Sequence, residues 1–186
     1  MNSNHALCGT PEWAAHLHGD VLPSVVQGVE LGAELIEIGP GPGAATDWLR
    51  TRVERVVAVE IDPHAADALA ARFHGSNVEV VRGDVTSLDF AEGSFDTVAS
   101  FTMLHHLETR AHQVRALSEA LRVLRPGGVL IGADSLHSNR LHHFHVDDTY
   151  NPIEPATLLT VLQVLGYEAI TVAVTDHVKF VARKPA

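Results

Sequence analysis

Residues 35–43 read LIEIGPGPG, a short apolar run with one acid, Glu37, that passes directly into a loop rich in glycine and proline. Glycines occupy alternate positions of this loop, at Gly39, Gly41 and Gly43. Glycine adopts positive φ freely and lets a ligand approach the backbone with no Cβ in the way. A purely structural turn is one explanation, but most turns need a single glycine. We therefore interpret the loop as a cradle for a ligand, placed at the end of a buried strand.

Short apolar segments rich in Val and Ile alternate with helix-like segments along much of the chain. The strand-like segments are residues 34–38, 55–59, 78–81, 95–100 and 129–133, and the helix-like segments between them are residues 44–51, 63–74 and 109–124. Strand-like runs bounded by Gly, Pro, Asp or Asn are typical of buried parallel strands. The alternation predicts βαβ units with right-handed crossovers.

The end of the chain departs from this alternation. Residues 155–165 read as a helix that ends at Gly166, and two strand-like runs follow at 167–175 and 177–182. One residue between these runs leaves no room for a crossover helix, so they are expected to pair antiparallel. The sequence thus predicts an α/β fold: a doubly wound, Rossmann-like, mostly parallel seven-stranded sheet with an antiparallel last strand and helices on both faces.

Two of the expected helices carry further local signals. Asp62 stands before a proline, which predicts an N-cap with proline in the first turn of the helix. The helix at 109–124 is expected to bury one apolar face. The residues on that face are Val114, Leu117, Leu121 and Leu124.

The length of 186 residues suits one domain with a single core. We expect an N-terminal helical extension over residues 1–33, a cofactor-binding core over 34–134, and a lid-like loop, a helix and the final strand pair over 135–186. The apolar contacts expected from the extension are Trp13, Leu17, Leu22 and Val25. The loop after the fifth strand, residues 135–154, is longer than a simple connection needs, and we interpret it as a lid that selects the substrate.

Composition excludes several classes of function. The formal net charge is −10 and the 13 Lys and Arg residues are scattered, which argues against nucleic acid as a partner. No apolar run is long enough to span a membrane. The single cysteine, Cys8, excludes an internal disulfide, and the N-terminus lacks the pattern of a signal peptide. A cytoplasmic location is therefore expected, and the oligomeric state stays open.

Three acids are expected at the carboxyl ends of neighbouring strands, where doubly wound sheets bind their ligands. These are Glu37, Glu60 and Asp84. Any one of them could be a helix cap or a solvated turn residue. Together they suit a ligand with an ammonium group, a ribose diol and an adenine amine, which favours S-adenosylmethionine.

An NAD(P)-dependent oxidoreductase is the alternative, because Gly39-x-Gly41-x-x-Ala44 followed by Glu60 fits a dinucleotide fingerprint loosely. Glu37 would however repel a pyrophosphate. Neither tyrosine of the chain is followed by lysine four residues later, so no Tyr-x-x-x-Lys pair is present for hydride transfer. A non-catalytic module that binds S-adenosylmethionine is a further alternative.

At this point the sequence resembles the class I S-adenosylmethionine-dependent methyltransferases. The matching motifs are EIGPGPG at 37–43, VVAVEIDP at 56–63, VVRGDVTSLDF at 80–90, FDTVASFTMLHHL at 95–107 and LRVLRPGGVLIGAD at 121–134. They occur in the family order and cover most of residues 34–134. The chain also resembles small bacterial, especially actinobacterial, methyltransferases of undefined substrate. The resemblance implies methyl transfer to a small-molecule acceptor.

The resemblance assigns roles to the first half of the motifs. Glu37 orients the amino group of the methionine part, directly or through water. Gly39, Gly41 and Gly43 pass close to the methionine and ribose parts. Glu60 accepts hydrogen bonds from both ribose hydroxyls.

The remaining cofactor residues follow in the same way. Ile61 flanks the adenine ring, Asp84 accepts from its exocyclic amine, and the backbone of Val85 contacts the ring. Ser100 and Phe101, at the end of the fourth strand, contact the methionyl group or admit the substrate.

Family membership does not identify a catalytic base, because methyl transfer mainly needs donor and acceptor to be aligned. His105 and His106 are the candidates, since they follow the fourth strand and imidazole titrates near neutral pH. A buried, hydrogen-bonded ring at a helix start is the structural alternative. The His-rich stretch after the fifth strand contains His137, His142, His143 and His145, followed by Asp147 and Asp148. Its spacing is not a strong metal signature, so we expect no metal site.

Overall fold

The structure is a computed structural model and describes residues 10–138, 143 and 148–186. Cys8, His142, His145 and Asp147 lie outside the described residues, as does part of the loop interpreted as a lid.

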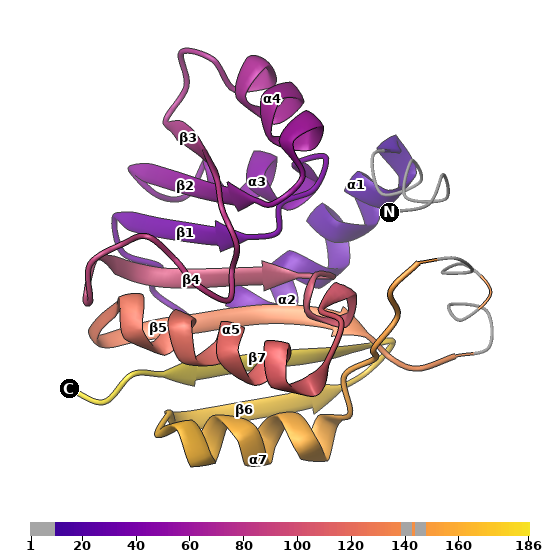
Figure 1. Ribbon diagram of the computed structural model, residues 1–186, viewed down its shortest axis with the longest axis vertical. Helices are drawn as coiled ribbons and strands as arrows, with labels where there is room; N and C mark the ends of the chain where they lie inside the picture. The colour runs from indigo at the N-terminus through magenta and orange to yellow at the C-terminus, as the bar shows by residue number, and fades with distance from the viewer. Residues whose placement is uncertain (1–9, 139–142, 144–147) are drawn as a thin grey trace.

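Seven strands in the described part of the chain form one sheet (Figure 1). They are β1 (Glu34–Ile38), β2 (Arg55–Glu60), β3 (Val78–Arg82), β4 (Phe95–Phe101), β5 (Leu124–Ser135), β6 (Glu168–Val174) and β7 (His177–Arg183). The order is β3-β2-β1-β4-β5-β7-β6. The neighbours from β3 to β5 pair in parallel, whereas β7 pairs antiparallel with both β5 and β6. The doubly wound sheet with an inserted antiparallel last strand is therefore confirmed.

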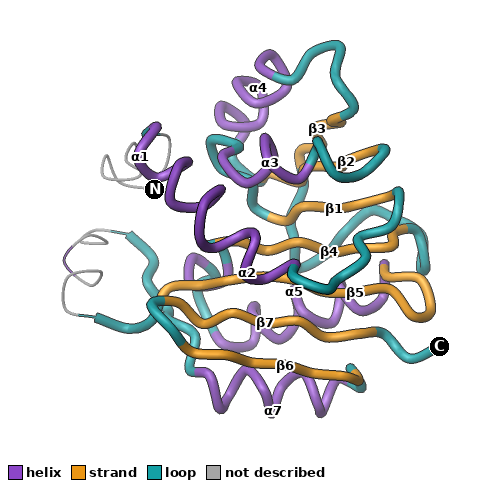
Figure 2. The backbone as a smooth tube through the Cα atoms, turned by 180° about the vertical axis from the view of Figure 1, so that it is seen from behind, coloured by secondary structure: helices purple, strands orange, loops and turns teal. Residues whose placement is uncertain are grey.

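Helices cover both faces of the sheet, as predicted. They are α1 (Pro11–His16), the π-helix η2 (Leu17–Val21), α2 (Leu22–Val26), α3 (Ala44–Leu49), α4 (Pro63–Arg72), the 3-10 helix η3 (Leu104–His106), α5 (Arg110–Val123) and α7 (Pro155–Leu165). Figure 1 shows α5 and α7 in front of the sheet, and Figure 2 shows α1 and α2 crossing the opposite face. Two large apolar clusters fill the space between sheet and helices, one on each face.

The N-terminal segment packs onto the sheet through the expected residues. Leu17, Leu22 and Val25 are buried, and Trp13 is half-buried against the same cluster. The sequence did not indicate that this segment winds as a π-helix over Leu17–Val21. Such local widening is rare and is found mostly at functional sites.

Helix α4 begins as its sequence indicates. The Asp62 carboxylate accepts hydrogen bonds from the amides of His64 and Ala65, both at 2.9 Å, and Pro63 occupies the first turn. The cap fixes where the chain turns away from the end of β2.

The buried face of α5 differs from the expected one. Leu117 is buried and Leu121 packs partly buried against the core, as expected, but Val114 is 36% exposed. The other buried residues of the helix are Gln113, Ala116, Ala120 and Val123. The assignment of Val114 was wrong because small alanines, together with Gln113, face the sheet. Leu124 is buried but belongs to β5, which starts five residues before the expected strand at 129.

None of the helices in the described ranges has both the length and the apolar content that a bilayer-spanning helix needs.

Candidate functional site

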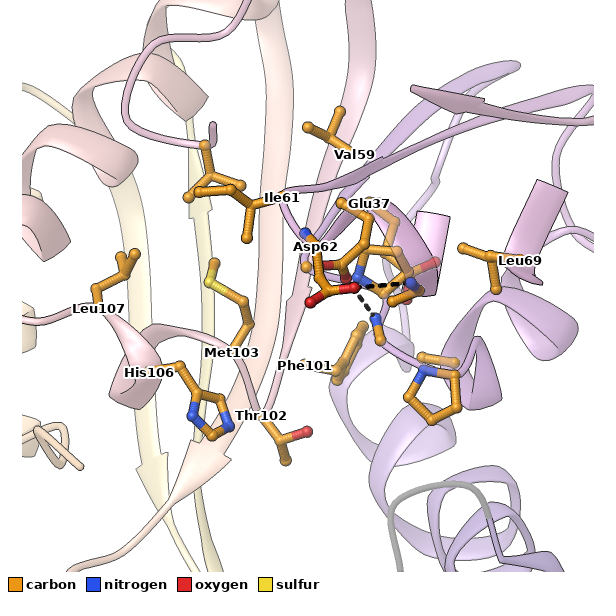
Figure 3. A pocket seen from close by; sticks show the side chains of 18 of the residues that line it. Glu37, Val59, Ile61, Asp62, Leu69, Phe101, Thr102, Met103, His106 and Leu107 are labelled. Atoms are coloured by element: carbon orange, nitrogen blue, oxygen red, sulfur yellow. Dashed lines mark hydrogen bonds between the residues drawn. The ribbon is translucent and has the colours of Figure 1, made fainter. Parts of the chain in front are cut away.

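A cavity of about 990 Å³ opens at the carboxyl ends of β1, β2 and β4 (Figure 3). Its walls come from the glycine loop, the start of α4, the turn after β3, the turn after β4 and the N-terminal helices. Glu37, Glu60 and Asp84 all line it. The three strand-end acids therefore share one hollow, as the sequence predicted for a common ligand site.

Glu37 is the most deeply placed of these acids. Its side chain is 2% exposed and accepts a hydrogen bond from Thr46 Oγ1 at 2.6 Å. Burial, with smaller contributions from Asp47 and Glu60, raises the pKa of Glu37 to about 7, while the Thr46 hydroxyl opposes this. Because burial makes ionisation of this carboxyl group unfavourable, a cation beside it stabilises the carboxylate.

Glu60 holds the glycine loop as well as facing the cavity. One carboxylate oxygen accepts from the Gly41 amide at 3.1 Å, and the other accepts from the Asp62 amide at 3.0 Å. A carboxylate has about four acceptor positions, so each oxygen retains capacity for a ligand hydroxyl. The side chain is buried at 4% exposure, which fixes its direction.

Asp84 is more accessible than the other two acids. It is exposed, and Oδ1 accepts from the amide and the hydroxyl of Thr86, both at 2.8 Å. Val85 is buried in the cavity wall next to it. Ile61 lines the mouth and is 65% exposed, an unusual position for a large apolar side chain. Together these residues form an open, partly apolar end with one acceptor group.

The three glycines of the loop serve different purposes. All have positive φ. A Cβ on Gly39 would overlap Met103 Cγ at 2.0 Å, and one on Gly43 would overlap Leu69 Cδ1 at 2.6 Å, so both positions are close-packed against protein. Gly41 lines the cavity, and a Cβ there would meet nothing within 4 Å. Of the three, Gly41 is thus the position where open space lies beside the backbone; Gly43 does not line the cavity.

The two predicted site residues at the end of β4 differ in whether they reach the cavity. Phe101 is buried in the cavity wall, whereas Ser100, at 1% exposure, does not line the cavity. Among the described residues the Ser100 hydroxyl has no hydrogen-bond partner.

The two candidate histidines also separate. His106 lines the cavity. His105 is 4% exposed and does not line it; its Nδ1 lies 2.6 Å from Oδ1 of Asp134, a fully buried residue near the end of β5. The two rings are 4.0 Å apart between centroids. Only His106 can therefore meet a molecule in the cavity directly.

Several residues of the wall were missed by sequence reasoning. Trp13 and Leu17 were expected to pack but not to line a ligand site, and Thr102 and Met103 were not singled out. Thr102 has a positive φ of 51°, which no sequence pattern predicts. Asp134 is a further acid near a strand end, but it does not line the cavity.

The described residues contain no group of three or more His, Cys, Asp or Glu side chains that could hold a metal ion. His137 and His143 are among them, whereas most of the His-rich stretch lies outside the described ranges.

Residues 36–132 match the family model described as "Methyltransferase domain". A Mycolicibacterium smegmatis protein named as a probable S-adenosylmethionine-dependent methyltransferase is 30% identical over 143 residues, 74% of this chain and 52% of that protein. A Thermococcus onnurineus protein named as a probable ribosomal RNA small subunit methyltransferase A is 39% identical over 75 residues, 39% of this chain and 28% of that protein. A Pyrococcus horikoshii protein has the same fold, with a TM-score of 0.82 and 16% identity over 99% of each chain.

The chain belongs to this methyltransferase family, and with it to the class I S-adenosylmethionine-dependent methyltransferases. The expected cofactor, S-adenosylmethionine, is confirmed by this membership, and the NAD reading of the glycine loop is not supported. The chain spans 28% and 52% of the length of the two curated relatives named above.

Proposed function

We propose that the chain transfers the methyl group of S-adenosylmethionine to a small-molecule acceptor. The observation that carries the proposal is the single cavity in which Glu37, Glu60 and Asp84 meet the wall formed after β4. Its volume of about 990 Å³ lies at the upper end for ligand sites, which leaves room for a cofactor and a small second molecule.

The buried end of the cavity suits the amino-acid part of the cofactor. We assign Glu37 to the ammonium group, because a cation there offsets the burial of the carboxylate. We assign Glu60 to the ribose diol, since both of its oxygens are already oriented by backbone amides. Gly41 supplies the open backbone between them.

The exposed end suits the adenine ring. We assign Ile61 to the face of the ring, Asp84 to its exocyclic amine and the Val85 backbone to its edge. An exposed isoleucine beside a cavity becomes buried when a flat ring covers it, which favours binding. We assign Phe101, which lines the cavity, to the methionyl end, whereas we expect no ligand contact from Ser100 or Gly43.

The charge of the lining restricts the acceptor. The acids that line the cavity are Glu37, Glu60, Asp62, Asp84, Glu108 and Asp148. Within the described residues Arg72 is the only Lys or Arg in the lining, and it donates to the Pro42 carbonyl and to Asp47. A phosphate-rich acceptor such as nucleic acid finds little compensation here, consistent with the net charge of −10. A cytoplasmic location stays a prediction from the sequence.

Methyl transfer mainly requires the protein to align the methyl donor with the acceptor. S-adenosylmethionine supplies a methyl group on a sulfonium sulfur. The protein residues hold the two partners in line and exclude water, and such alignment supplies up to roughly 7–11 kcal/mol of the barrier in the best cases.

Calorimetry followed by turnover tests the proposal. We expect micromolar binding of S-adenosylmethionine and S-adenosylhomocysteine and no binding of NADH. The purified chain is then incubated with methyl-labelled S-adenosylmethionine and a panel of phenols, thiols, carboxylic acids, amines and a ribosomal RNA fragment. Labelled product from any small molecule supports the proposal, whereas methylation of the RNA alone contradicts the acceptor class. Tight cofactor binding without turnover across the panel would favour the non-catalytic module.

A further inference from the structure

The turn between β4 and α5 begins with a strained residue. Thr102 has φ 51, and in the described part of the chain it shares a positive φ with only one other non-glycine residue, Ala169. This region is a genuine outlier for a β-branched side chain. The Thr102 amide donates to the Ala133 carbonyl at 2.8 Å, which holds the strained geometry in place. Strain of this kind persists where the surrounding structure enforces it, often at functional sites.

A buried polar pair holds the same turn from the other side. Asp134 Oδ1 lies 2.6 Å from His105 Nδ1 and accepts from the Ser135 amide at 2.7 Å, while Oδ2 lies 3.4 Å from the His105 amide. Placing a carboxylate in the interior is unfavourable unless it is fully hydrogen-bonded. The pair thus fixes the direction of the His105 ring.

These two features fix the place of His106. Its ring lies against that of His105, with centroids 4.0 Å apart, and faces the cavity that His105 does not reach. Figure 3 shows His106, Thr102 and Met103 close together on the wall after β4. The lining residues nearest to His106 in the chain are the apolar Met103 and Leu107 and the acid Glu108, and Trp13 and Leu17 line the same cavity from the N-terminal helices.

We propose that His106 accepts the proton of a weakly acidic hydroxyl group on the methyl acceptor, and that Asp134 and His105 are positioning residues for it. The inference rests on the proposed function and names its acceptor class: a small, uncharged, largely apolar molecule with a phenol-like hydroxyl. The hydroxyl oxygen attacks the methyl carbon, and the O–H proton passes to a ring nitrogen of His106. The electrons of the broken carbon–sulfur bond stay on sulfur, so the sulfonium becomes a neutral thioether.

The first test reads the ionisation of a bound phenol and needs no turnover. 4-Nitrophenol is titrated into the chain saturated with S-adenosylhomocysteine, and the phenolate is followed by its absorbance. We expect the bound nitrophenol to ionise at lower pH than in water, and His106→Gln to abolish this shift. The matched control is His74→Asn, because His74 is exposed in the turn after α4 and does not line the cavity. Failure to bind any phenol, or an unchanged shift in His106→Gln, overturns the inference.

The second test uses turnover with phenols of graded acidity. His106→Gln is expected to lower kcat about a hundredfold or more for phenols that are neutral at the assay pH, the scale of general base catalysis. Phenols already ionised in solution should lose far less. An equal loss for all phenols, with S-adenosylhomocysteine binding intact, overturns the role as base. Methylation of amines or thiols but of no hydroxyl overturns the inference and leaves the proposed function standing; no binding of S-adenosylhomocysteine defeats the proposed function itself.

Two variants test the positioning role. Asp134→Asn should lower kcat while the affinity for S-adenosylhomocysteine is kept. Thr102→Gly removes the strain, so its unfolding temperature should not fall, yet kcat should fall because the turn is less fixed. Thr102→Gly therefore still tests how the turn is held if Asp134→Asn folds poorly. A normal kcat per folded molecule in Asp134→Asn overturns the positioning role of Asp134, and a normal kcat in Thr102→Gly overturns the role of the strained turn.

Discussion

Two buried carboxylates near strand ends, Glu37 on β1 and Asp134 on β5, behave in opposite ways. Among the described residues Glu37 receives one hydrogen bond, from the Thr46 hydroxyl, and faces the cavity. Asp134 is hydrogen-bonded to the His105 ring, accepts a hydrogen bond from the Ser135 amide, and does not line the cavity. The protein leaves hydrogen-bonding positions of Glu37 open where a cationic ligand is expected, whereas it supplies the hydrogen bonds of Asp134 itself. Strand ends of one sheet thus supply both a binding group and an internal support.

The largest loss of stability is expected from substitution of Asp134. Asp134→Ala leaves the buried His105 ring without its carboxylate and should lower the free energy of unfolding by about 3–5 kcal/mol, the scale for breaking a buried pair. Urea unfolding at pH 7 measures this. Asp96 also accepts from two backbone amides, of Ala33 and Glu34, but it is less buried. Asp96→Ala should therefore cost less, and equal losses would remove the distinction drawn for Asp134.

Substitution of Glu37 should have the opposite effect and raise the free energy of unfolding near and above pH 7. Its pKa of about 7 in the fold lies above 4.5, so the folded chain binds the proton more tightly than the unfolded chain. The stability from this group is fully present below pH 4.5 and is lost as the pH rises to about 7. A rise of this size corresponds to about 3 kcal/mol. Glu37→Gln removes the titration, so at pH 8 it should unfold at higher urea than the wild type.

The control for Glu37 is the pH series itself. At pH 4.5 the wild type and Glu37→Gln should unfold with nearly equal free energies, because the native side chain is then protonated. A constant difference between pH 4.5 and pH 8 would show that burial of the charge is not the cause. Added S-adenosylmethionine should stabilise the wild type more than the variant at pH 8, since the carboxylate is the form that binds a cation.

Sequence reasoning found Glu37 and missed Asp134 for a physical reason. A glycine loop directly after a buried strand marks Glu37 within nine residues, so the pattern is local. Asp134 gains its meaning from His105, 29 residues earlier, and only the pairing of β4 with β5 brings the two together. The φ of Thr102 is likewise set by tertiary contacts.

The fold was more predictable than the site because each strand carries its own apolar run and its own boundary. The antiparallel pairing of β6 with β7 followed from the short connection expected between the last two strands, which in the structure consists of Thr175 and Asp176. Where one element's face depended on its neighbours, as at Val114, the local pattern misled. The roles assigned to the cofactor residues stay predictions until a ligand is bound.

Glu60 tests the binding side of the comparison. Glu60→Ala should weaken S-adenosylhomocysteine binding by about 1.5–3 kcal/mol, the scale for hydrogen bonds to a charged group. Part of this loss reflects the Gly41 amide, which loses its acceptor. Calorimetry measures the affinity, and Glu79→Ala, an exposed acid on β3 paired with Arg55, is the control. Equal affinities of the two variants would argue against the ribose assignment.

The smallest effect is expected in the glycine loop beside Glu37. Gly41 and Gly75 both have positive φ, 52 and 76, and a Cβ on either would meet nothing within 4 Å. Replacing either by alanine should therefore cost a similar, small amount of stability, about 1–2 kcal/mol for a left-handed residue. Only Gly41 lines the cavity, so only Gly41→Ala should also weaken S-adenosylhomocysteine binding, by about tenfold or about 1.4 kcal/mol. Equal stability losses with equal affinities would mean that the open space at Gly41 does not hold the ligand, and the loop beside Glu37 would then be a turn and no more.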